Sequence, residues 1–217
     1  MLDLTFHGLE RPSCVLLLGA HCDDLEIGCG GTIMQMVERW PNTKFVWVTL
    51  SSDAGRAAET RAAAAQLLVG AANTVVQVEQ FRGGYFPYDG ALLKEYFETL
   101  KTHRPDVILT HYRNDLHQDH RITNELTWNT FRNHLILEYE IPKFDGDLGI
   151  PNTFLPLPLV TLEKKIEILL ECFPSQLHRT WFTRSTFQAL ARLRGIECNA
   201  ASGFAEAFYG RKNRILL

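Results

Sequence analysis

The chain has 217 residues and a formal net charge of −3, and 46% of its residues are hydrophobic. This length fits one domain, residues 1–217, and the apolar fraction suffices for a core, which excludes a mainly disordered chain. The balanced charge excludes the strongly basic surface that is typical of nucleic-acid binding. The longest apolar run, Val15–Ala20, is much shorter than the roughly 20 residues of a membrane span. Met1–Arg11 lacks the apolar centre of a secretory signal.

The cysteines are odd in number and scattered, at positions 14, 22, 29, 172 and 198. A domain of this size does not need a disulfide framework, so we expect reduced thiols and a cytoplasmic protein. No C-x-x-C pair occurs, and an isolated cysteine usually behaves as a small buried hydrophobic residue.

Short apolar segments alternate with segments of helical pattern along residues 1–135. The predicted strands are Ser13–Gly19, Lys44–Leu50, Thr74–Val78 and Asp106–Thr110, and the predicted helices are Gly28–Arg39, Ala57–Leu68, Ala91–Thr102 and Arg121–Asn133. This alternation predicts an α/β fold with a mainly parallel sheet, because each strand is followed by a crossover helix.

Residues 136–217 have a different pattern, with a proline-dense stretch at Ile150–Pro158. The predicted strands here are Glu138–Ile141 and Thr153–Pro156, and the predicted helices are Leu162–Cys172 and Ser185–Arg194. We expect this C-terminal part to complete the sheet and the pocket, either as a sheet extension or as a cap.

The first predicted strand leads directly into Ala20-His21-Cys22-Asp23-Asp24-Leu25-Glu26. Ligands of parallel α/β sheets bind at the carboxyl ends of strands, and adjacent buried carboxylates repel unless a cation or hydrogen-bond donors compensate them. His21 and Asp24 are suitable zinc ligands, which leaves Asp23 as a general base. Two alternatives remain: the aspartates cap the next helix, or the following glycines bind a dinucleotide. The second fits poorly because Ile33 stands where the G-x-G-x-x-G pattern needs its third glycine.

The fourth predicted strand leads into a second polar segment, His111–Arg121, with three histidines and two aspartates in its first ten residues. A catalytic zinc site uses three protein ligands, so this segment needs to supply only one. Asp119 could accept the second N–H of a neighbouring imidazole and thereby fix its tautomer. The alternative is a hydrophilic surface loop.

These segments resemble the motifs of the PIG-L/LmbE-like zinc-dependent N-deacetylases. Ala20–Gly31 is similar to the family's Ala-His-Pro-Asp-Asp-Glu motif with its glycine-rich helix start, and Asp115–His120 is similar to Asp-x-His-x-Asp-His. Arg56–Glu59 is similar to the Arg-x-x-Glu that leads an alanine-rich helix. The resemblance extends over most of the chain, with late matches at Pro151–Leu157 and Ala205–Phe208. It implies a Rossmann-like three-layer sandwich.

The resemblance also implies a ligand set and a base. His21, Asp24 and His120 match the zinc ligands, one Zn²⁺ per chain, which another divalent metal such as Fe²⁺ could replace. Asp23 matches the base that activates the zinc-bound water.

The resemblance implies three further roles and contains two departures. His117 matches the imidazole that stabilises the oxyanion or protonates the amine, Asp119 its orienting carboxylate, and Arg56 a residue that contacts substrate. Cys22 stands where the family usually has proline, and the family's next acid is shifted by one residue to Glu26.

The expected function is removal of the acetyl group from an N-acetylated amino sugar or sugar nucleotide by a protein that could form a homo-oligomer. The alternatives are another zinc amidase or esterase, a two-metal phosphate hydrolase, and a non-catalytic module whose site is closed by four protein ligands. Tyr85–Gly90 is the candidate specificity loop, with Arg82 beside it as a possible contact for a substrate anion. Five aromatic residues could form a wall for the sugar: Tyr85, Phe86, Tyr88, Trp128 and Tyr139. His7, His103, His134 and His178 lie outside both motifs, and we expect surface or core positions for them.

Overall fold

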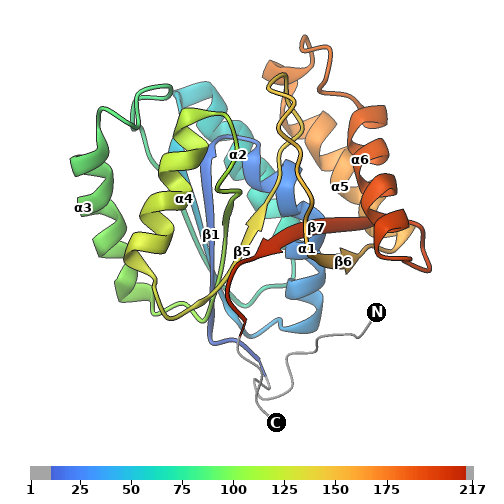
Figure 1. The fold of residues 1–217 in the computed structure, drawn as a ribbon, viewed down its shortest axis with the longest axis horizontal. Coiled ribbons are helices and arrows are strands. Elements are labelled where there is room, and N and C mark those ends of the chain that lie inside the picture. The colour runs from blue at the N-terminus through green and yellow to red at the C-terminus, as the bar shows by residue number, and fades with distance from the viewer. Residues whose placement is uncertain (1–10, 214–217) are drawn as a thin grey trace.

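The computed structural model describes residues 11–213, which form an α/β fold with a seven-stranded sheet (Figure 1). The strands are β1 Cys14–His21, β2 Lys44–Ser51, β3 Asn73–Val78, β4 Val107–His111, β5 Leu135–Tyr139, β6 Thr153–Pro156 and β7 Ala205–Gly210. The helices are α1 Asp24–Arg39, α2 Ala54–Leu67, α3 Gly90–Leu100, α4 Gln118–Thr130, α5 Leu159–Cys172 and α6 Arg184–Glu197. His7 and most of Met1–Arg11 lie outside the described residues.

The sheet has the strand order β3-β2-β1-β4-β5-β7-β6. β7 is antiparallel to both of its neighbours, and the pairs among β1 to β5 are parallel. The predicted mainly parallel α/β fold with a C-terminal sheet extension is therefore confirmed. In the described residues no helix is both long and apolar enough to cross a membrane.

Successive side chains of a strand point to opposite faces of the sheet. Because β1 has apolar side chains on both faces, helices cover both faces and bury them. Val15 and Leu17 of β1 pack in one core with α1, α2 and α5, whereas Leu16 and Leu18 pack in the other with α3 and α4. In Figure 1, α3 and α4 lie on one side of β1 and α5 on the other.

Two helix starts and one strand differ from the predictions in ways that affect the site. α1 begins at Asp24 and α4 at Gln118, so Asp24, Asp119 and His120 are helical rather than in loops. The start of α4 was difficult to predict because its N-cap is His117, which is not one of the usual capping residues. β7 was not among the predicted strands, although its sequence had matched the family.

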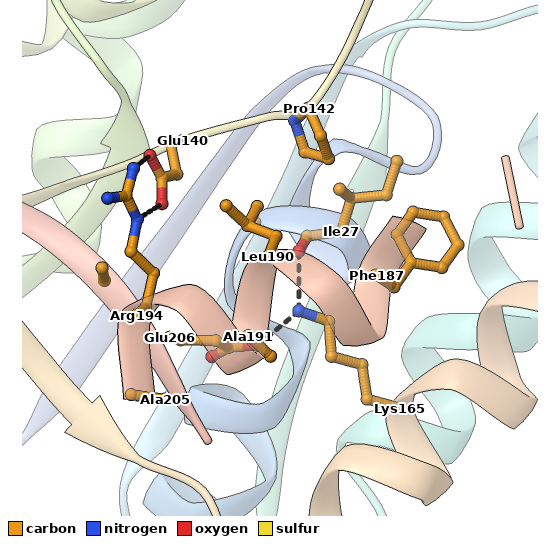
Figure 2. Close-up of a pocket in the computed structure, with 12 residues that line it drawn as sticks. Ile27, Glu140, Pro142, Lys165, Phe187, Leu190, Ala191, Arg194, Ala205 and Glu206 are labelled. Carbon is orange, nitrogen blue, oxygen red and sulfur yellow. Dashed lines mark hydrogen bonds and ion pairs between the residues drawn. The ribbon is translucent and has the colours of Figure 1, made fainter. Parts of the chain in front are cut away.

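The helix α1 is interrupted at Cys29, whose backbone angles, φ −149° and ψ 20°, are not helical. Lys165 of α5 and Glu206 of β7 lie at this interruption (Figure 2). The glycines around it allow close packing: a Cβ at Gly28 would lie 2.2 Å from the Tyr139 ring, and one at Gly31 would lie 2.8 Å from Leu157. Side-chain packing thus accounts for these glycines without a bound phosphate.

β1 and β4 are neighbours in the sheet although two strands separate them in sequence, so the strand order reverses between them. Such a switch point is where open α/β sheets bind ligands, beyond the carboxyl ends of the strands. The two polar motifs follow these two strands, so the topology brings them together.

Candidate metal centre and catalytic residues

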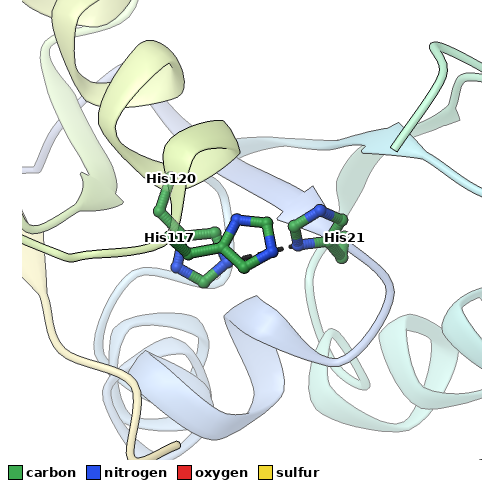
Figure 3. Close-up of side chains that lie close together, drawn as sticks. All are labelled: His21, His117 and His120. Carbon is green, nitrogen blue, oxygen red and sulfur yellow. Dashed lines mark hydrogen bonds between the residues drawn. The ribbon is translucent and has the colours of Figure 1, made fainter. Parts of the chain in front are cut away.

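Three potential ligands converge from three elements at the switch point. His21 ends β1, Asp24 begins α1, and His120 lies in the first turn of α4. His21 Nδ1 is 3.2 Å from His120 Nε2 and 3.5 Å from Asp24 Oδ2, and His120 Nε2 is 3.5 Å from Asp24 Oδ1. Figure 3 shows His21 facing the paired rings of His117 and His120.

These separations fit a tetrahedral metal ion. Ligand atoms at about 2.0–2.1 Å from zinc are about 3.3–3.4 Å apart along the edges of a tetrahedron. The outward nitrogens also favour this arrangement, because His21 Nε2 lies 2.9 Å from Asp119 Oδ2 and His120 Nδ1 lies 2.9 Å from Asp115 Oδ2. If each outward nitrogen donates to its carboxylate, the neutral rings present lone pairs to one another, as metal-ligating imidazoles do.

The electrostatics of the cluster favour a positive charge at this point. Burial lowers the pKa of His120 to about 3, so its ring is neutral. Burial opposes charge on His21 as well, but hydrogen bonds to Asp119 and Asp24 raise its pKa to about 10. Burial likewise opposes ionisation of Asp24, yet His120 and His111 hold its pKa well below its usual value. A divalent cation would supply the charge that a proton on His21 otherwise provides, so the residues present fit a metal ion.

Asp23 is strained and does not act as a capping residue. Its φ of 97° lies in the left-handed region, which costs a non-glycine residue about 1–3 kcal/mol, and its side chain makes no capping hydrogen bond to α1. Burial raises the pKa of Asp23, the Arg56 guanidinium opposes this rise, and the Asp24 carboxylate adds to it. The helix-capping alternative therefore does not describe Asp23, whose carboxyl is held beside the metal-capable cluster.

Arg56, the expected substrate contact, lies against the first motif. Its Nη2 is 3.0 Å from Asp23 Oδ2 and also donates to the Cys22 carbonyl oxygen. Cys22 itself is fully buried, and burial raises the pKa of its thiol to about 11. Cys22 is consequently a protonated packing residue where the family usually has proline.

His117 faces the two candidate ligand histidines. Its ring centroid lies 4.7 Å from that of His21 and 4.6 Å from that of His120. Its Nδ1 accepts the backbone N–H of Asp119 at 3.2 Å, so the neutral ring carries its proton on Nε2. Burial lowers the pKa of His117, with the His21 charge adding to the effect, which favours this neutral donor form.

The carboxylate of Asp119 has a different partner from the expected one. It accepts from His21 Nε2 and from the backbone N–H groups of Gly84 and Phe86, whereas only its backbone contacts the His117 ring. Asp119 therefore orients a candidate ligand and ties the segment around Tyr85 to the site.

Only part of the expected aromatic wall is accessible. Phe86 and Tyr139 are fully buried, and Trp128 donates to Glu138 at 2.6 Å. Tyr85 and Tyr88 are exposed, with their ring centroids 6.0 Å apart.

Two residues of the site had no role in the sequence-based interpretation. Asp115 Oδ2 contacts His120 Nδ1, while its Oδ1 accepts the backbone N–H of His117. His111 is fully buried, stacks on His120 with 3.9 Å between centroids, and places Nε2 3.1 Å from Asp24 Oδ2. For Asp115 the signal was the motif itself, in which an acid five residues before a candidate ligand histidine can reach its outer nitrogen. His111 lies outside the motif at the end of β4.

Replacing Asp115 by asparagine should weaken metal binding. The charged acceptor of the His120 N–H is lost, and losing such an outer partner costs about 10–100-fold in metal affinity. Asp147→Asn is the matched control, because Asp147 shares the Lys143 ammonium with Asp115. Its carboxylate accepts from the Leu116 N–H rather than from His120. Chelator-competition titration of both variants measures the effect; equal dissociation constants would contradict the orienting role.

Comparison with known families matches the part of the chain that contains both motifs and the strands between them. Residues 16–131, more than half of the chain, match the family model described as PIG-L: GlcNAc-PI de-N-acetylase. The chain belongs to the PIG-L family. A search of curated proteins by sequence found no match.

Solved structures share the fold of this PIG-L protein at low sequence identity. A conserved protein of Thermus thermophilus is 18% identical, with 94% of this chain and 96% of that chain covered and a TM-score of 0.75. GalB, the 4-carboxy-2-hydroxymuconate hydratase of Pseudomonas putida, is 18% identical, with 94% of this chain and 98% of that chain covered and a TM-score of 0.74. The N,N'-diacetylchitobiose deacetylase of Pyrococcus horikoshii is 19% identical, with 94% of this chain and 85% of that chain covered and a TM-score of 0.67. Because a hydratase and a deacetylase share this fold, the reaction of the PIG-L protein must be argued from its site.

Proposed function

We propose that this PIG-L protein is a zinc-dependent hydrolase that removes the acetyl group from an N-acetylated amino sugar or sugar conjugate. The observation that carries the proposal is the convergence of His21, Asp24 and His120 at 3.2–3.5 Å, with Asp23 beside them. Membership of a family described as a de-N-acetylase supports the choice of amide hydrolysis.

In this mechanism His21, Asp24 and His120 hold zinc, which when bound acidifies water and polarises the substrate carbonyl. Asp23 accepts the proton of the attacking water. Its raised pKa suits this role, because a general base works best when its pKa lies near the working pH. Arg56 keeps the Asp23 carboxylate in place through their 3.0 Å ion pair.

His117 stabilises the developing oxyanion in this proposal. Its neutral ring carries the free proton on Nε2, and a donor aimed at such an oxyanion contributes about 3–4 kcal/mol. Because Nδ1 is occupied by the Asp119 N–H, the ring cannot rotate without losing that hydrogen bond. The substrate nitrogen then takes a proton, from Asp23 or from His117, as its bond to the acetyl carbon breaks, and it leaves as the free amine while the acetyl group is released as acetate.

The exposed face of the 82–88 segment supports a sugar conjugate as the substrate. Tyr85 and Tyr88 offer aromatic surface next to the backbone N–H groups that bind Asp119. The Arg82 guanidinium lies 3.3 Å from the centre of the Tyr85 ring. From there it could bind a phosphate or carboxylate of the conjugate.

The test is a screen of N-acetylated monosaccharides, their phosphates and their nucleoside diphosphate conjugates with the zinc-loaded protein. We expect equal amounts of free amine and acetate, and no product from the metal-free protein. Arms with p-nitrophenyl acetate and p-nitrophenyl phosphate distinguish esterase and phosphatase activity. A zinc-loaded protein that hydrolyses either of these but none of the amides would overturn the proposal.

Metal analysis gives a second test, with one zinc per chain expected. The two metal-capable groups found among residues 11–213 are His21–His117–His120 and Asp24–His111–His120. Both groups include His120, which supports a single centre rather than the pair of metals that many phosphoryl-transfer enzymes use.

A further inference from the structure

The interruption of α1 has an unusual hydrogen-bond arrangement. In a continuous α-helix the N–H of Gly31 would donate to the carbonyl oxygen of Ile27, four residues earlier. Here the Gly31 N–H donates to Glu206 Oε1 at 2.8 Å, and Lys165 Nζ donates to the Ile27 oxygen at 2.7 Å. Lys165 Nζ and Glu206 Oε1 are 2.6 Å apart. A buried ion pair thus takes the place of one backbone hydrogen bond (Figure 2).

The second half of α1 depends on the same carboxylate. Glu206 Oε2 accepts from the backbone N–H of Thr32 at 2.6 Å and from its hydroxyl at 2.5 Å. A carboxylate that binds the first free N–H groups of a helix both satisfies them and interacts favourably with the helix dipole. Since Lys165 and Glu206 are 6% and 4% exposed, water cannot easily replace either of them.

The first half of α1 carries the candidate metal ligand. Asp24 is its first residue, Asp23 comes directly before it, and the Ile27 oxygen that accepts from Lys165 lies one turn later. We propose that the Lys165–Glu206 pair is a positioning device that fixes this first turn, and with it the Asp24 carboxylate, against His120. Both residues lie outside the 16–131 region that the family model matches.

This inference rests on the metal site of the proposed function, and zinc affinity tests it. The double variant Lys165→Met/Glu206→Gln removes both charges together, so no unpaired charge remains buried. Its zinc dissociation constant, from chelator competition, should rise about 10–100-fold, as for other residues that orient ligands.

The matched control is Glu140→Gln/Arg194→Met. Glu140 and Arg194 form a bidentate pair in the same pocket, at 2.7 Å and with 5% and 6% exposure, but their hydrogen bonds reach α6 and Gly149 rather than α1. We expect this control to lower the melting temperature and leave zinc affinity unchanged. An unchanged affinity in the Lys165/Glu206 variant, or an equal loss in both variants, would show that the pair is structural only.

Hydrogen exchange of the native protein provides a measurement that needs no variant. If the Lys165–Glu206 pair couples the interruption of α1 to the metal site, zinc should slow hydrogen exchange at the Gly31 and Thr32 amides. The slowing should be larger than that at the β2 amides. Equal slowing in both segments would overturn the inference. Native protein that binds no zinc would instead refute the proposed function, so the two failures are distinguishable.

Discussion

Replacing Asp23 by asparagine should lower kcat for deacetylation about 10²–10⁴-fold while one zinc per chain remains bound. An amide has nearly the same shape as the carboxylate but cannot accept the proton of the attacking water, and general-base catalysis contributes about this factor. The proposed ligands His21, Asp24 and His120 are unchanged in the variant. Steady-state kinetics with metal analysis of the same samples gives both numbers.

Asp53→Asn is the control for this substitution. Asp53 follows the neighbouring strand β2 and caps α2 through a 2.9 Å hydrogen bond from the Arg56 N–H, and asparagine caps a helix about equally well. We expect its kcat to stay near that of the native protein. Activity within threefold of native in Asp23→Asn, with zinc bound, would show that another group accepts the proton.

Replacing His120 by alanine should remove the metal and the activity together. Four-ligand structural sites bind zinc with about 10–16 kcal/mol, so one ligand accounts for about 3 kcal/mol, or roughly a hundredfold or more in affinity. His120 is shared by both metal-capable groups, so its loss should affect zinc binding whichever group holds the ion. Zinc titration and acetate release measure the two effects.

Further histidine variants separate the ligand sets. His178→Ala, an exposed change outside both motifs, should bind zinc as the native chain does. If zinc is held by His21, Asp24 and His120 alone, His117→Ala should keep the metal and lose rate, because His117 then acts on the substrate. Loss of zinc from His117→Ala would instead show that His117 is itself a ligand, either in the His21–His117–His120 group or as the fourth protein ligand of a closed, non-catalytic site.

The parallel strands and the two motifs were predictable because each has a local signal, whereas the antiparallel strand β7 was not predicted. Buried parallel strands are continuous apolar runs, and a parallel sheet places the polar residues after β1 and β4 at the same edge. They meet because the structure makes these two strands neighbours. The convergence of His21, Asp24 and His120 followed from that topology. The resemblance to PIG-L proteins, which the family match confirms, came from the same residues.

The residues that could not be predicted act over long distances or against local preference. Glu206 contacts Gly31 across 175 positions, and no local pattern couples a glutamate in a late strand to a break in an early helix. The pairing of Asp119 with His21 depends on the approach of α4 to β1, which one-dimensional spacing does not encode. The sequence motifs indicated which residues belong to the candidate site. The packing of the elements determines which carboxylate orients which histidine.

The place of β7 in the sheet has a consequence for the order of events during synthesis. β7 lies between β5 and β6, although it is the last strand of the described chain to leave the ribosome. Until it is made, β5 keeps an unpaired edge, and such edges are prone to aggregation. All three proposed ligands are present by residue 120, but Glu206 arrives much later. The nascent chain therefore carries the three proposed ligands well before β7 pairs with β5 and brings Glu206, the residue proposed to fix the first turn of α1.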